Sequence, residues 1–165
     1  MPFRNFDVAR AVAVLWGTSG LDSHFTRYWT TAEIADYLVL MDEEAAPTQA
    51  WPYCVYESVA STTLRRSSAS KPQKNRQEVN EDTLRFHVFA KDVDEKSAKA
   101  LCSDLVDEIL KVFGGHPDEY QRGLPLQNGS VINQEYNQTI LVREDEEIWK
   151  ATVIYTISYE LSLKD

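Results

Sequence analysis

Apolar residues recur at two spacings along this chain, and each spacing predicts a different kind of element. Residues 6–16 repeat apolar side chains every three or four positions, which predicts a short helix that Gly17 ends. The clearest helical pattern covers residues 93–113, with Asp94 as the expected N-cap and Gly114-Gly115 as the stop. Its apolar face can be buried only against a sheet or another helix.

Alternation of apolar and polar residues is typical of half-buried strands, and several segments carry it. Strands are predicted over 53–59, 84–90, 131–142 and 148–161, and a short apolar run predicts another over 37–41. The acidic residues between the last two strands are expected to form their hairpin turn. Thr30 and Glu33 have the spacing of a capping box, which predicts one further helical turn.

This order of elements predicts an α+β fold, with a mainly antiparallel sheet of about four to five strands and two or three helices packed on one face. The length of 165 residues fits a single domain over 1–165. Within it we expect an N-terminal helical region (1–36), a sheet-and-helix core (37–165) and a mobile basic loop (61–78).

The net charge of the chain argues against some classes of function. The chain has 17 Lys and Arg against 26 Asp and Glu, a net charge of -9, which argues against a general binder of nucleic acid or of anionic membranes. The N-terminus lacks a signal-peptide pattern, and the longest apolar run is too short to cross a membrane. Cys54 and Cys102 are far apart in sequence, so we expect buried free thiols.

The basic loop is the one unusual electrostatic feature. It has five cations with no acid between Val59 and Gln77, which leaves a charge of -14 on the rest of the chain. The cations are Arg65, Arg66, Lys71, Lys74 and Arg76. Three interpretations stay open: a solvated connection, docking onto an acidic surface such as another copy of the chain, or contact with passing nucleic acid. Candidate partners for docking are Glu144, Asp145, Glu146 and Glu147.

Nothing in the sequence predicts catalysis. The three histidines are scattered without a second ligand at metal-site spacing, and no nucleophile elbow, P-loop or dinucleotide motif occurs. We therefore expect no enzyme activity, no catalytic residue, no metal and no cofactor.

Several segments together carry a resemblance to a known family. They are Ala46-Pro47, the strand motif Trp51-Pro52-Tyr53-Cys54-Val55-Tyr56, the strand Arg85–Ala90, the helix positions Ala98, Leu101, Leu105 and Ile109, and the last strand Ala151–Leu161. In this order they resemble the tail terminator, or tail completion (head–tail joining), family of long-tailed bacteriophages and prophages. The chain departs from that family in a longer region over 17–45 and in its long basic loop.

The resemblance implies a structural virion assembly protein, a minor tail protein that caps the finished tail tube as a homo-oligomeric ring, usually of six subunits. Its implied partners are its own copies, the tail tube protein and the head–tail connector protein, without membrane or sequence-specific nucleic acid. Its implied location is the tail or neck of the virion, after assembly in the host cytoplasm. Two alternatives stay open: a neck or head-completion protein of similar build, and a small α+β enzyme or ligand-binding domain.

Overall fold

The structure is a computed structural model in which four helices and five strands are described. The elements are α1 (Arg4–Ser19), α2 (Asp22–Thr26), α3 (Thr31–Asp36), β1 (Leu40–Met41), β2 (Tyr53–Arg66), β3 (Asn75–Lys91), α4 (Ala98–Phe113), β4 (Gly129–Arg143) and β5 (Ile148–Lys164). The described residues are 4–42, 45, 48–66, 75–117, 123–127 and 129–164. Side chains are described for all of these except 4–7, 59–66, 75–78 and 161–164.

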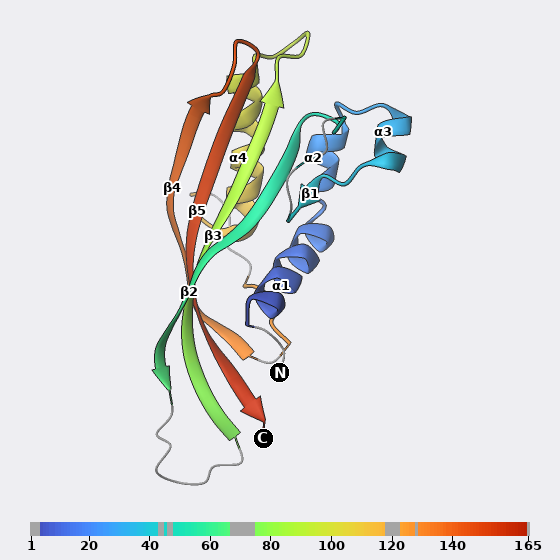
Figure 1. Cartoon of the computed structure of the whole chain (residues 1–165). Helices are drawn as coiled ribbons and strands as arrows, with labels where there is room; N and C mark the ends of the chain where they lie inside the picture. Colours follow the sequence, from blue (N-terminus) through green and yellow to red (C-terminus); the bar gives the residue numbers. More distant parts are fainter. Residues whose placement is uncertain are drawn as a thin grey trace.

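The five strands form one sheet in the order β1-β2-β3-β5-β4 (Figure 1). β1 runs parallel to β2, and every other neighbouring pair is antiparallel. The hairpin turn expected between the last two strands joins β4 to β5. The α+β prediction is therefore confirmed.

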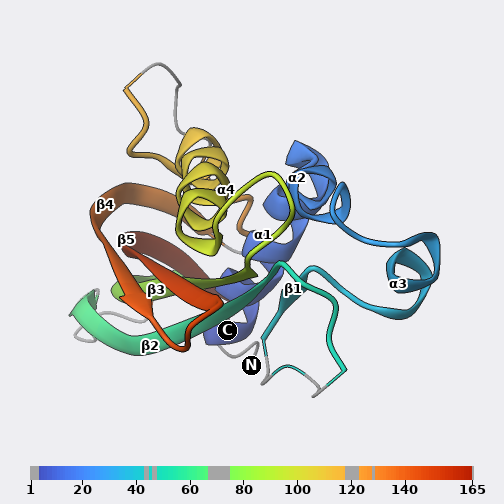
Figure 2. The same cartoon turned by 90° about the horizontal axis from the view of Figure 1, so that it is seen from above.

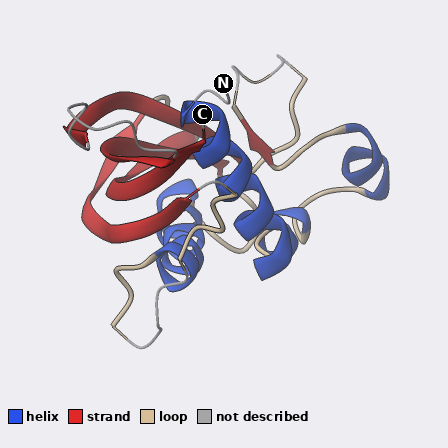
Figure 3. Cartoon of the chain, turned by 90° about the horizontal axis from the view of Figure 1, so that it is seen from below, coloured by secondary structure: helices blue, strands red, loops and turns tan. Residues whose placement is uncertain are grey.

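The long helices lie on one side of this sheet (Figures 2 and 3). α4 packs on β3 and β5, and α1 lies against α4 and β2. Leu101, Leu105 and Ile109 of α4 are buried in one apolar cluster with Phe86 and Val153 of the sheet. The predicted apolar face of this helix thus has the sheet as its partner.

Three helix ends test the capping rules. The box at Thr30 and Glu33 is present in full and begins α3, as predicted. The expected cap at Asp94 is wrong: a tight turn occupies residues 93–96, and the Ser97 hydroxyl accepts the hydrogen bond from the Ala100 amide. α1 also continues past Gly17 and ends before Gly20, whose positive φ of 74° suits glycine.

Two strand predictions also needed correction. The run 37–41 forms a strand only at Leu40–Met41, where it pairs with β2. The predicted loop 61–78 is wrong at both ends, because residues 61–66 extend β2 and residues 75–78 extend β3. These polar segments are strands because β5, a strand of 17 residues, provides a ladder along the whole of β3.

The row formed by Leu84 and Tyr155 is the boundary between two halves of the sheet. α4 ends at this row, where the Tyr155 hydroxyl donates a hydrogen bond of 2.7 Å to the Gly114 carbonyl oxygen. We call the rows toward the β4–β5 turn the helix-covered half, and the rows toward the ends of β2 and β3 the hairpin half. Figure 1 shows the strands crossing one another between the two halves, as in a strongly twisted sheet.

β-Bulges interrupt both outer strands at the same levels. One in β2, between Ser58 and Ala60, and one in β4, between Tyr136 and Gln138, flank the Leu84–Tyr155 row. A second pair, at 63–65 and 131–133, flanks the row of Asn80 and Tyr159. Because bulges increase the local right-handed twist, they account for the crossing of the strands.

Candidate assembly surfaces

The predicted acidic turn lies at one end of the sheet, and the structure adds a second acidic segment beside it. Residues 144–147 form the β4–β5 turn, and all four are exposed. The backbone amide of Asp92, in the β3–α4 connection, donates to the Glu147 carbonyl oxygen at 3.2 Å. We define the acidic cap as Asp92, Asp94, Glu95, Glu144, Asp145, Glu146 and Glu147, and all seven are exposed.

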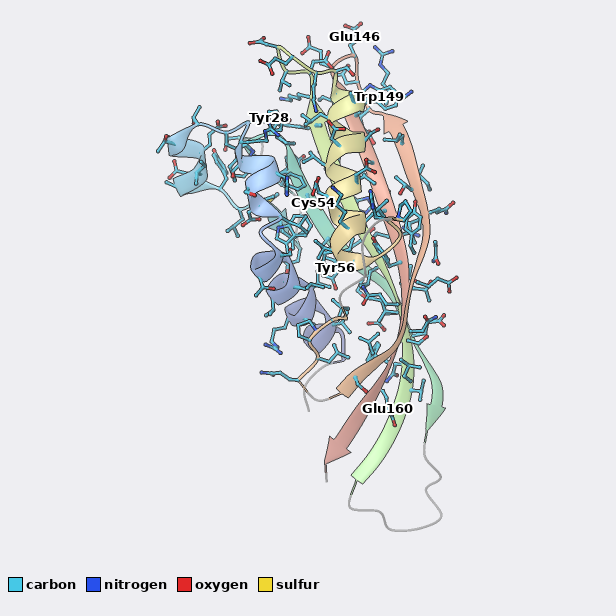
Figure 4. The ribbon with its side chains drawn as sticks, turned by 180° about the vertical axis from the view of Figure 1, so that it is seen from behind. Tyr28, Cys54, Tyr56, Glu146, Trp149 and Glu160 are labelled. Atoms are coloured by element: carbon cyan, nitrogen blue, oxygen red, sulfur yellow. The ribbon has the colours of Figure 1, made fainter. Side chains whose placement is uncertain are left out.

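Arg143 stabilises the backbone of the β4–β5 turn. Its guanidinium donates to the carbonyl oxygens of Asp145 and Glu146 at 3.3 and 3.2 Å. These bonds hold the turn backbone while the carboxylates point to solvent, as Figure 4 illustrates for Glu146. The sequence predicted this turn. It did not predict the acidic segment 92–95 beside the turn, because its pattern indicated a helix that begins at residue 93.

The predicted basic residues belong to the opposite end of the sheet. Arg65 and Arg66 end β2, and Arg76 is near the start of β3. Lys71 and Lys74 lie outside the described residues. The charge there is less one-sided than the sequence indicated, because the register sets Glu78 of β3 directly opposite Arg66.

The two charged ends are too far apart to attract each other within one subunit. β5 connects them with 17 residues, which at about 3.3 Å per residue span about 50 Å. Charges are screened beyond a Debye length of about 8 Å at physiological ionic strength. Within one molecule the arginines and the acidic residues 144–147 therefore lie too far apart to pair. The pairing expected from the sequence requires two molecules.

The long sides of the sheet carry open backbone. Among the described strands, β4 pairs only with β5, so its other edge is unpaired over Gly129–Arg143. Large apolar side chains are exposed along this strand: Ile132, Ile140, Leu141 and Val142, at 57, 42, 38 and 45% exposure. On the other side, β1 pairs only with Cys54 and Val55, which leaves the rest of the β2 edge unpaired by the described strands.

Aromatic rings gather on the sheet face turned away from the helices. Tyr53 and Phe89 stack with ring centroids 5.0 Å apart, and Trp51 meets Tyr53 edge-on. The ammonium groups of Lys91 and Lys150 lie over Trp51 and Phe89 at 4.3 and 5.6 Å. These contacts make the outer face rigid near the acidic cap.

A cleft of about 230 Å³ lies between α2 and α4. Polar side chains pair at it: His24 of α2 contacts Glu108 of α4 at 3.4 Å, Lys111 contacts Glu108 on the same helix at 3.3 Å, and Lys96 donates a hydrogen bond to Asp104. The hydrogen bond that Lys96 donates raises its pKa. The cleft is smaller than usual ligand sites and its charges pair with one another, so we assign it no ligand.

The described residues contain no group of three side chains that could hold a metal ion. Cys54 and Cys102 are both free and buried, as predicted. Burial raises the pKa of the Cys102 thiol to about 12, so it stays protonated at neutral pH. None of the described helices is both long and apolar enough to span a membrane.

Comparisons with known proteins add one structural likeness. No family model matches the chain, and no curated protein matches it. One solved structure, the virion of a native gene transfer agent particle, has a chain that aligns with 85% of this chain and 91% of its own length, at 13% identity and a TM-score of 0.43. A likeness at this level carries no functional conclusion.

Proposed function

We propose that this chain is a structural protein of a phage-like virion that caps the end of the tail tube as a ring and joins tail to head. The observation that carries the proposal is the separation of two unlike ends on one rigid sheet. The acidic cap lies at one end, and the arginine-bearing ends of β2 and β3 lie about 50 Å away at the other.

A joining protein needs two separate binding ends, because it must hold one partner on each side at the same time. The two ends here are held at a fixed distance by the antiparallel ladder of β3 and β5. The family resemblance of the strand and helix motifs supports the same function. Ring closure further requires that unlike patches of neighbouring copies meet, which is the heterologous type of contact.

In this proposal the arginine-bearing hairpin docks on an acidic surface of an adjacent subunit or of the tube end. Each exposed charge pair contributes only about 0.2–1 kcal/mol. Several pairs repeated around a ring together stabilise the contact. The attraction weakens with salt, since the Debye length falls from about 10 Å at 0.1 M to about 3 Å at 1 M.

The test is a pair of charge variants. The first changes Arg65, Arg66, Lys71, Lys74 and Arg76 to Ser. The second changes Glu144, Glu146 and Glu147 to Gln and Asp145 to Asn. The matched control neutralises three exposed carboxylates elsewhere: Asp36, Asp42 and Asp107.

We expect both test variants to stay folded but to lose ring formation or tail joining, while the control keeps them. Light scattering across a salt series and tail-joining complementation measure these outcomes. If both test variants assemble and join tails like the wild type at every salt concentration, the two ends are only solvated and the proposed function is wrong.

A further inference from the structure

No described strand pairs with the outer edge of β4 or with the outer edge of β2 beyond Val55, and this raises the question of what covers them. An edge strand exposes unpaired N–H and C=O groups at every second residue, which is a template for another strand. Proteins usually protect such edges with Pro, Lys or inward charges. β4 carries one charge, Glu135, between Gly129 and Val142, and β2 carries none between Ser58 and Leu64.

We propose that copies of this chain join edge to edge, with the outer edge of β4 in one copy pairing with the outer edge of β2, residues 57–66, in the next. The inference rests on the proposed function, because it names the contact by which the ring would close. The occupant of each edge is therefore a second copy of this chain.

Strand direction favours this pairing. β2 is antiparallel to β3, β3 to β5, and β5 to β4, so the two outer strands run in opposite directions. When a second copy of the same orientation is placed beside the first, β4 meets β2 antiparallel and the sheet continues without a break. Repetition by rotation then closes a ring in which no edge remains free.

The shapes of the two edges also match. Both outer strands carry their bulges at the same two levels, flanking the Leu84–Tyr155 and Asn80–Tyr159 rows. Since a bulge bends and twists its strand, the two edges curve at corresponding heights. At these levels the 57–66 edge lies opposite residues 129–138 of β4, so the exposed side chain of Ile132 would be covered by the neighbouring copy, which removes apolar surface from water.

This geometry assigns different partners to the two charged ends. If subunits stand side by side in one orientation, all acidic caps face one side of the ring and all hairpins face the other. The arginines would then reach the next layer along the tail axis rather than the neighbour in the same ring. Edge pairing would close the ring, and the charged ends would join it to the structures above and below.

Hydrogen–deuterium exchange on the unmodified chain tests the pairing. The exchange rates of the backbone amides are measured in three samples: the dilute monomer, the chain at high concentration, and the chain bound to the ends of tail tubes from the same particle. We expect every second amide in both 129–138 and 57–66 to exchange about tenfold more slowly, or slower still, on assembly. The inner strands β3 and β5 are the internal control, because they are paired in both states.

Each of three other outcomes would overturn the proposed pairing. Slowing in β4 alone indicates a two-fold β4–β4 contact and overturns the proposed pairing. An assembled sample with neither edge slowed overturns edge pairing but leaves the proposed function intact. A chain that neither self-associates nor binds tube ends overturns the proposed function, and the edge pairing fails with it.

A lysine on the β4 edge gives an independent test. Ile132→Lys adds charge to the edge, and Ile34→Lys is the matched control at an exposed apolar position away from it. We expect about tenfold weaker self-association, or weaker, for the β4 variant only. Circular dichroism checks that both variants fold. Equal assembly of the two variants would overturn the inference.

Discussion

The two halves of the sheet share the same ladder but have different interiors. In the helix-covered half, the residues of β3 that face the helices are Leu84, Phe86, Val88 and Ala90, and all four are fully buried. In the hairpin half the same inward positions are Asn80 and Asp82, which are also fully buried. Alternation therefore specifies a strand in both halves, but in the hairpin half the inward side of β3 is polar and, among the described side chains, only β5 contributes buried apolar residues there, Ile157 and Tyr159.

The hairpin half compensates for its polar interior with hydrogen bonds. The Tyr159 hydroxyl donates to a carboxylate oxygen of Asp82 at 3.1 Å, and the Gln134 side-chain amide donates to the Phe113 carbonyl oxygen at 2.5 Å. A buried polar group is stable only when it is paired in this way. The comparison teaches that the two halves depend on different interactions, and the following experiments test that difference.

The largest expected effect belongs to the helix-covered half. Leu105→Ala removes a side chain that is 2% exposed between α4 and the sheet, so it should lower the free energy of unfolding by about 2–5 kcal/mol. Ile132→Ala, at an exposed position of β4, is the control and should change it by less than about 0.5 kcal/mol. Denaturant unfolding measures both. Equal stability of the two variants would contradict the packing described for α4.

A smaller loss is expected in the hairpin half. Asp82→Ala removes the acceptor of the Tyr159 hydroxyl from a buried site, at a cost of about 1–3 kcal/mol. Glu81→Ala, one residue away on the opposite face, is the matched control and should cost less. Urea unfolding curves measure the difference. A neutral Asp82→Ala would show that this half does not depend on its buried hydrogen bond.

The boundary between the halves offers a pH test. Burial raises the pKa of Tyr155 above its ordinary value of 10.0, because the charged phenolate would lose its hydration, and the neighbouring Tyr136 adds to the rise. The neutral phenol therefore contributes stability that is present below pH 10 and is lost as the pH rises further.

Tyr155→Phe should cost about 0.5–1.5 kcal/mol at neutral pH and should weaken the loss of stability above pH 10. Thermal unfolding of wild type and variant between neutral pH and pH 11 measures this. Unfolding curves with the same pH dependence for both proteins would contradict the burial of the phenol.

The smallest effect is on thiol chemistry and leaves stability unchanged. Since both native cysteines are buried and the pKa of Cys102 is about 12, neither should react with a disulfide reagent at pH 8 in the folded chain. Ser130→Cys, at an exposed position of the hairpin half, should react at once. Fast labelling of the unsubstituted chain would show that the helix-covered half opens readily.

The sequence predicted the local elements where a residue pattern has one physical outcome. The apolar face of the helix through Leu101, Leu105 and Ile109 and the alternation along β5 required a helix packed on a sheet. The polar ends of β2 and β3 escaped prediction, because local composition lacks the apolar signal of a strand. The polar end of β3 pairs with β5, which follows it by more than 70 residues in the chain, and the polar end of β2 pairs with β3.

The candidate surfaces, like the fold, were predictable from the sequence only in part. The sequence by itself determined that residues 144–147 form an exposed acidic turn, because four consecutive carboxylates between two strands can only be solvated. Only the tertiary structure decided that Asp92, Asp94 and Glu95 join that turn, that Glu78 lies opposite Arg66, and that the charged ends lie about 50 Å apart. The physical reason is that pairing partners and strand register are set by long-range hydrogen bonding and burial, which act between residues that no local pattern connects.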